Sequence, residues 1–133
     1  MTLQFLLDTD TCVYWLRGRE SVRQHMLNTD PTVITISIIT LAELRYGAAC
    51  SAQPDANNQA IDTFTGAIAV IGIDALVAQR FADIKADLRR RGALLEDSDL
   101  FIAATALTLG VTLVTNNQEH FRRVPQLKLE NWV

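Results

Sequence analysis

The side chains in this sequence that are best suited to chemistry are carboxylates. Five of them could share one site: Asp8, Asp10, Glu43, Asp97 and Asp99. Mg²⁺ prefers oxygen ligands and keeps several waters, so its protein sites are built from a few carboxylates. A zinc site is not indicated, because His25 and His120 lie on separate segments and no C-x-x-C pair occurs. The glycine-rich loops that cradle nucleotides are absent as well.

Each acid also has an explanation that needs no function. Asp8 and Asp10 follow an apolar run and suit a polar turn or a helix N-cap. Glu43 completes a capping box with Thr40, in which the Glu side chain bonds the backbone of the cap residue. Asp99 opens an apolar helix, where the helix dipole favours an anion by about 0.3 to 1 kcal/mol. No acid therefore indicates a site by itself.

Strands alternate with helices along the whole sequence. Apolar and β-branched runs predict strands at residues 3–7, 32–36, 69–73, 111–115 and 127–129. Helical periodicity predicts helices at residues 11–16, 20–27, 41–49, 61–67, 75–91 and 99–109. Residues 53–58, with Pro54, form a loop or the start of a helix. The alternation predicts an α/β fold, a mostly parallel central sheet flanked by helices. A length of 133 residues, 49% of them hydrophobic, fits a single domain over residues 1–133.

Two polar clusters follow predicted strands. Asp8-Thr9-Asp10 comes after the first strand and Thr115-Asn116-Asn117 after the fourth. In open parallel sheets, ligands bind outside the carboxyl ends of the strands, where the strand order reverses. The two clusters are therefore the first indication of a functional site.

The net charge of −3 does not exclude a nucleic-acid substrate. If the five acids named above share a metal site, 12 Lys and Arg remain against 10 of the 15 Asp and Glu. Basic residues cluster at Arg17 and Arg19, at 89–91 and at 122–123, although any one cluster also fits a solvated surface.

Four segments in this order resemble the PIN-domain family, and in particular the VapC-type toxins of toxin–antitoxin pairs. They are residues 6–10 (LLDTD), 37–44 (SIITLAEL), 99–106 (DLFIAATA) and 112–117 (TLVTNN). The D-x-x-I-A-A-x-A and L-V-T-N-N patterns are the most specific, and residues 129–132 (LENW) are typical of one VapC branch. The resemblance covers essentially the whole chain.

The resemblance implies a PIN-like α/β/α sandwich, a homodimer and a Mg²⁺- or Mn²⁺-dependent endoribonuclease. The acidic ligands of the family map onto Asp8, Glu43 and Asp99. Hydrolysis is expected to leave a 5′-phosphate and a 3′-hydroxyl, with water as the nucleophile. Gathering three carboxylates is costly unless a cation neutralises them. Asp10 and Asp97 are expected as auxiliaries of this cluster.

The residues after the fourth predicted strand depart from the pattern of many family members. A fourth acid is frequent there, whereas this chain has Asn116 and Asn117. Asn117 is expected to ligate the metal through its carbonyl oxygen or to hold a metal-bound water. Glu119 is a weaker substitute for the missing fourth acid. One strongly bound metal is therefore favoured over two. Thr9 and Thr115 resemble the hydroxyl residues that line the family's site and are expected to bond carboxylates or phosphate.

The resemblance also implies partners. They are a cognate VapB-like antitoxin and an RNA substrate, with initiator tRNA suggested by family analogy, and DNA is bound only indirectly through the antitoxin. A toxin–antitoxin hetero-oligomer is expected. The sequence holds no run of about 18 apolar residues, so a cytoplasmic protein without membrane contact is expected.

Two other functions remain open on the sequence alone. A phosphoryl-accepting receiver domain would use Asp74 after the third strand, but no Lys follows Thr115 to complete its site. A PIN fold kept only as an interaction module would need no catalysis, and the full set of acids argues against it.

Overall fold

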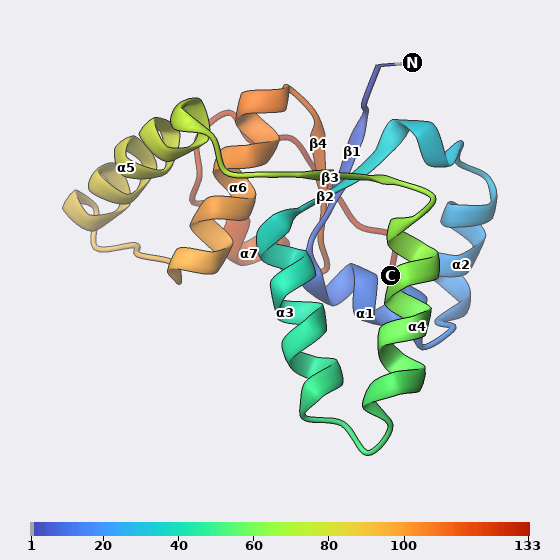
Figure 1. Ribbon diagram of the computed structural model, residues 1–133. Helices are drawn as coiled ribbons and strands as arrows, with labels where there is room; N and C mark the ends of the chain where they lie inside the picture. Colours follow the sequence, from blue (N-terminus) through green and yellow to red (C-terminus); the bar gives the residue numbers. More distant parts are fainter. Residues whose placement is uncertain (1) are drawn as a thin grey trace.

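The chain folds around a parallel sheet with helices on both faces (Figure 1). The computed structural model describes residues 2–133. Its strands are β1 (Phe5–Leu7), β2 (Ile34–Ser37), β3 (Ala69–Ile71), β4 (Thr112–Val114) and β5 (Leu129–Glu130). They lie in the order β3-β2-β1-β4-β5, and every neighbouring pair is parallel. The predicted α/β fold is confirmed, and the strand order reverses between β1 and β4.

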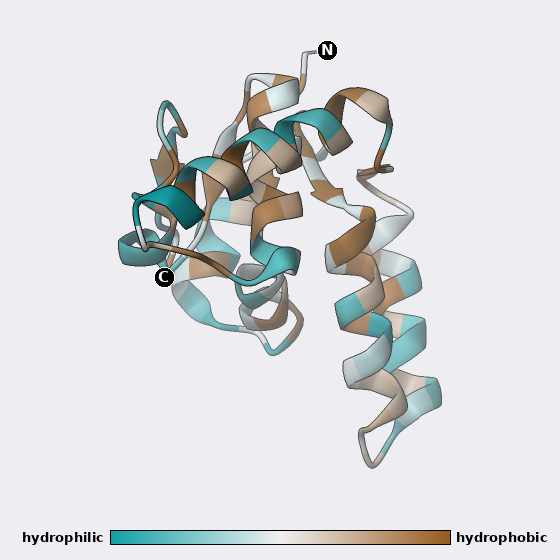
Figure 2. Ribbon diagram, turned by 90° about the vertical axis from the view of Figure 1, so that its left-hand side faces the viewer, coloured by the Kyte–Doolittle hydropathy of each residue, from teal (hydrophilic) through white to brown (hydrophobic). Residues whose placement is uncertain are grey.

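The helices divide between the two faces of the sheet. They are α1 (Thr9–Leu16), α2 (Glu20–Leu27), α3 (Ile38–Ala49), α4 (Pro54–Thr65), α5 (Ala75–Arg90), α6 (Asp97–Leu109) and the short α7 (Gln118–Phe121). One core cluster joins α5 and α6 to the sheet, and the other joins α1 to α4 to its opposite face. Figure 2 shows α3 and α4 projecting together from the sheet as a hairpin.

The two faces follow from the alternation of side chains along each strand. Leu6 of β1 and Leu113 of β4 pack with α5 and α6, whereas their neighbours Leu7 and Val114 pack on the side of α1 to α4. All four side chains are fully buried. Strands buried on both faces need apolar residues at successive positions, and this is why the strands appear as continuous apolar runs.

Several element boundaries differ from the predicted ones, and three of the differences have a clear local cause. Helix α3 begins at Ile38 rather than at residue 41, because the Ser37 side chain accepts from Ile39 N at 3.1 Å and caps it. Pro31–Val33 form a 3₁₀ turn ahead of β2, since Asp30 caps the Thr32 N–H at 2.9 Å. Helix α4 begins at Pro54, the position in a helix that proline tolerates best.

Within residues 2–133, every helix is too short or too polar to cross a membrane.

Candidate active site

Asp8 lies where β1 passes into α1, beside β4. Its backbone N–H donates to Val114 O at 3.0 Å, which holds it at the carboxyl ends of the two strands. The Asp8 carboxylate caps α1 by accepting from Thr11 N at 2.9 Å, and only 5% of the residue is exposed. Asp8, rather than Asp10, is therefore the N-cap. The capping role and a role in a site coexist in one side chain, because a carboxylate has two oxygens.

Glu43 reaches the same region from α3. The Thr9 hydroxyl donates to Glu43 Oε1 at 2.6 Å and also lies 3.1 Å from the Thr40 hydroxyl. The alternative of a capping box is wrong, because Ser37 caps α3 and Thr40 lies inside the helix with its side chain buried. Glu43 is thus held by Thr9 of α1, whose hydroxyl bonds a carboxylate as expected.

Helix α6 supplies Asp99 together with an acid that the sequence did not single out. Glu96 precedes the helix at its N-cap position and makes no capping hydrogen bond with its side chain. Asp97, expected as an auxiliary, instead pairs with Lys85 of α5 at 2.8 Å and does not face the other acids. Residues three apart share a helix face, so the spacing of Glu96 and Asp99 was the signal that could have found Glu96.

The loop after β4 completes the site from the other side. The Thr115 side chain is buried, hydrogen-bonds the Asp8 carboxylate and accepts from Asn117 N at 2.9 Å. The Asn117 side-chain amide lies 2.8 Å from His120 Nδ1 of α7. Asn116 instead bonds Asn131 at 3.1 Å. Of the two asparagines, only Asn117 faces the acids.

These residues surround a polar hollow of about 220 Å³, which we call the carboxylate hollow. Its lining consists of Asp8, Thr9, Asp10, Glu43, Glu96, Ser98, Asp99, Asn117 and Phe121. The structure therefore brings the acids expected as ligands, Asp8, Glu43 and Asp99, to one place. Thr115 supports the hollow from below its surface, and neither Asp97 nor Glu119 lines it. Asp74 caps α5 by accepting from Val77 N at 2.9 Å and does not line the carboxylate hollow, so it does not combine with these acids into a receiver-type site.

Burial and repulsion by nearby acids raise the pKa values of two residues in the hollow, Asp8 and Asp99. Burial raises the pKa of Asp8, while hydrogen bonds from Thr115 and Thr11 lower it by a smaller amount. The pKa of Asp99 rises to about 6, first through burial and then through the nearby charges of Glu43, Glu96, Asp8 and Asp10. The charged form of Asp99 is thus disfavoured both by burial and by the negative charges around it.

The donor set of the hollow fits a hard divalent cation. Carboxylate oxygens come from three separate helices or helix caps, with the amide oxygen of Asn117 beside them. Burial and, second, repulsion by the neighbouring acids raise the pKa of Asp99, and a bound cation would stabilise its charged form against both. Within residues 2–133, no three acidic, His or Cys side chains stand close enough together to form a finished set of ligands. The fit rests on donor chemistry and charge.

Replacing Asp99 with Asn should stabilise the metal-free protein. Because the folded pKa of about 6 exceeds the ordinary 3.8, stability is lost as pH rises through this range. Solvent screening at this half-buried site reduces the effect. In EDTA at pH 7.5 we expect the Tm of Asp99→Asn to exceed that of the unmodified chain by about 2–5 °C.

The same comparison at pH 4.5 serves as the control. Asp99 is then largely protonated in the folded protein, so the gain in Tm from Asp99→Asn should shrink. A variant that melts at the same temperature as the unmodified chain, or below it, at pH 7.5 would show that the charged form of Asp99 is not disfavoured in the folded protein.

Comparison with known proteins identifies the family. A family model described as "PIN domain" matches residues 5–127. "Ribonuclease VapC2" of Haemophilus influenzae is 36% identical over 131 residues, covering 98% of this chain and 99% of that protein. The "tRNA(fMet)-specific endonuclease VapC" of Salmonella typhimurium is 34% identical over 130 residues, covering 98% of each.

A solved structure agrees with the sequence matches. It is the crystal structure of VapBC2 from Rickettsia felis bound to a DNA fragment from their promoter. It superposes with a TM-score of 0.91 at 33% identity and covers 98% of this chain and 100% of that one. The fold, the family profile and the full-length relatives agree, and the chain belongs to the PIN-domain family, in its VapC branch.

Proposed function

We propose that this chain acts as an endoribonuclease toxin in which Asp8, Glu43 and Asp99 hold one Mg²⁺ or Mn²⁺ ion in the carboxylate hollow. The observation that carries the proposal is the convergence of these acids at the point where the strand order reverses. Family membership makes the chain an RNA-hydrolysing enzyme that uses a divalent metal ion.

The residues of the hollow have separate tasks in this proposal. With a cation bound, the site gains the positive charge that stabilises a reacting phosphate and acidifies an attacking water. Thr9 orients Glu43, and Thr115 orients both Asp8 and the Asn117 backbone. Asn117 presents an amide to the phosphate or to water, its orientation fixed by His120. Water attacks phosphorus, the bond to the 3′-oxygen breaks, and that oxygen leaves with a proton as a 3′-hydroxyl.

Purified protein and total RNA test the proposal. We expect cleavage at discrete positions with Mg²⁺ or Mn²⁺, fragments with 5′-phosphate ends, and no cleavage in EDTA until the metal is restored. Sequencing of the fragment ends would locate the cuts. Because a relative is named for tRNA(fMet), we propose initiator tRNA as the substrate.

Two results would contradict this function. RNA that stays intact with either metal would favour a PIN fold kept as an interaction module. Cleavage that continues in EDTA, or that leaves a 2′,3′-cyclic phosphate, would exclude metal-dependent attack by water and place the chemistry elsewhere.

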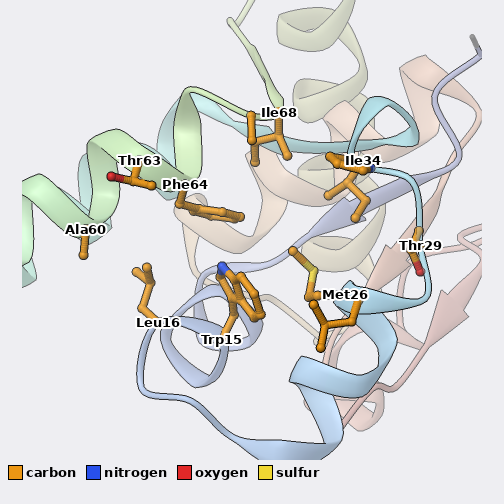
Figure 3. Close-up of a pocket in the computed structure, with 12 residues that line it drawn as sticks. Trp15, Leu16, Met26, Thr29, Ile34, Ala60, Thr63, Phe64 and Ile68 are labelled. Atoms are coloured by element: carbon orange, nitrogen blue, oxygen red, sulfur yellow. The ribbon is translucent and has the colours of Figure 1, made fainter.

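The VapBC complexes among the structural relatives indicate an antitoxin partner, with DNA bound through the antitoxin. The same analogy supports our proposal of a homodimer inside a toxin–antitoxin hetero-oligomer. The surface best suited to an apolar segment of the antitoxin is a groove of about 550 Å³ between α1, α2 and α4 (Figure 3). Trp15, Met26, Phe64 and Ile68 line it, and Leu27 at its edge is 68% exposed.

This apolar groove leads toward the carboxylate hollow. Leu16 and Ala60 line both the groove and a second hollow of about 240 Å³ between α1, α3 and α4. Glu43 in turn lines both that second hollow and the carboxylate hollow. An antitoxin segment anchored in the groove can therefore continue over the acids. We infer that it inhibits the enzyme by covering them.

A further inference from the structure

The structure separates the arginines that already have acidic partners from those that do not. Arg45 pairs with Asp62 at 2.6 Å, and Arg91 pairs with Asp87 at 2.9 Å. Their charges are largely matched within the protein. In the part of the chain that the structure describes, Arg17 and Arg123 form no ion pair. These two guanidinium groups keep their charge for a ligand.

Arg17 and Arg123 line two different hollows, and each of these adjoins the carboxylate hollow. Arg17 lines the hollow between α1, α3 and α4, which shares Glu43 with the carboxylate hollow. Arg123 lines a hollow of about 280 Å³ that shares Asp99 and Asn117 with it. One unpaired arginine thus adjoins the site next to Glu43, and the other adjoins it next to Asp99 and Asn117.

Arg123 is held in position before any ligand arrives. Its Nη1 donates to Leu94 O at 3.2 Å, and its own carbonyl oxygen accepts from Arg91 Nη2 at 2.6 Å. Arg91 is fixed in turn by Asp87. His120 lines the same hollow and orients Asn117. A preorganised guanidinium loses little freedom on binding an oxyanion, and its planar donors match phosphate geometry.

From this arrangement we propose that Arg17 and Arg123 bind the RNA phosphates on either side of the scissile one. The RNA strand runs from the α1/α3/α4 hollow, across the acids, into the hollow beside α7. The row of carboxylates repels the RNA polyanion, and the two arginines offset this repulsion at the phosphates next to the scissile one. This inference rests on the proposed ribonuclease function and adds a strand path to it.

Binding of RNA in EDTA tests the path without cleavage. The probe is a fluorescein-labelled segment of initiator tRNA that spans the mapped cleavage site, and its anisotropy is followed at several salt concentrations. Arg17→Gln and Arg123→Gln should each weaken binding at least about 5-fold and reduce the slope of log K against log salt by about 0.7. The matched controls are Arg89→Gln and Arg122→Gln, which remove exposed, unpaired arginines that line none of the three hollows. They should bind within about 2-fold of the unmodified chain, with an unchanged slope.

Neutral methylphosphonate linkages assign each arginine to a side of the cut. A linkage placed next to the scissile phosphate should weaken binding by the unmodified chain. The same linkage should cause no further loss of RNA binding in the variant that lacks the arginine on that side. Equal losses in test and control variants, arginine variants that bind normally, or no salt-dependent binding by the unmodified chain would overturn the path.

Cleavage in Mn²⁺, measured in parallel, separates the two proposals. If the unmodified chain cuts RNA while the arginine variants bind normally, the path is wrong and the ribonuclease assignment stands. If the unmodified chain does not cut, the proposed function fails and the path fails with it.

Discussion

Asp8→Asn and Asp99→Asn should each slow metal-dependent RNA cleavage by at least about 10³-fold while the protein stays folded. Such a loss corresponds to about 4 kcal/mol of transition-state stabilisation, the range expected when a bound cation is lost or misplaced. Both changes remove a charged oxygen from the carboxylate hollow but keep the size and polarity of the side chain. Single-turnover kinetics in Mn²⁺ measures the effect, and circular dichroism checks the fold.

The geometry of Asp8 explains why its variant should stay folded. Asp8 caps α1 through Thr11 N, and Asn is as good an N-cap as Asp, whereas Ala would cost about 1 kcal/mol. For Asp99→Asn, the expected stabilisation of the metal-free protein makes a loss of activity through unfolding still less plausible.

The matched control for both variants is Asp97→Asn. It removes an acid two residues from Asp99, but one that pairs with Lys85 and does not line the carboxylate hollow. Activity within about 3-fold of the unmodified chain is expected, since an exposed ion pair contributes little. Full activity in Asp8→Asn or Asp99→Asn, or an equal loss in Asp97→Asn, would refute the ligand assignment.

Sequence periodicity predicted the sheet, because its strands are apolar on both faces and are separated by helices. At two boundaries that it placed wrongly, a polar side chain had changed the local backbone. Ser37 starts α3 one turn early, and Asp30 turns Pro31–Val33 into a 3₁₀ segment. These caps are single hydrogen bonds that periodicity does not detect. Helix α7 has only four residues, too few for a periodic signal.

The acids of the site could be predicted as a set. The residues around them could not, because their positions depend on where each helix begins and on contacts between distant segments. The apolar segment 99–106 predicts a helix that begins at Asp99, two residues late, so Asp97 was expected as an auxiliary and Glu96 was not singled out. Once α6 begins at Asp97, Glu96 and Asp99 lie on one face and Asp97 on another. The contact of Thr9 with Glu43 spans 34 residues, and no local pattern encodes it.

The second large effect is expected in antitoxin binding. Leu27→Asp should weaken the complex with the cognate antitoxin at least about 100-fold, because a buried Leu contributes about 1.5–3 kcal/mol and a buried charge costs more. Leu27 is 68% exposed in the free chain, so the substitution should leave the Tm nearly unchanged. Titration calorimetry with the antitoxin measures the affinity. Ribonuclease activity without antitoxin should persist, since Leu27 does not line the carboxylate hollow.

Leu76→Asp is the matched control, because Leu76 is 69% exposed but lies on α5, away from the apolar groove. It should keep its antitoxin affinity within about 3-fold, a difference below 1 kcal/mol. If both variants lose affinity equally, exposed apolar residues in general matter and the groove has no special role. If Leu27→Asp binds normally, the antitoxin reaches the acids by another route. If only Leu27→Asp loses antitoxin affinity and its ribonuclease activity persists, the variant is a toxin that its antitoxin no longer inhibits. This follows because the antitoxin covers the carboxylate hollow only while it is anchored in the neighbouring groove.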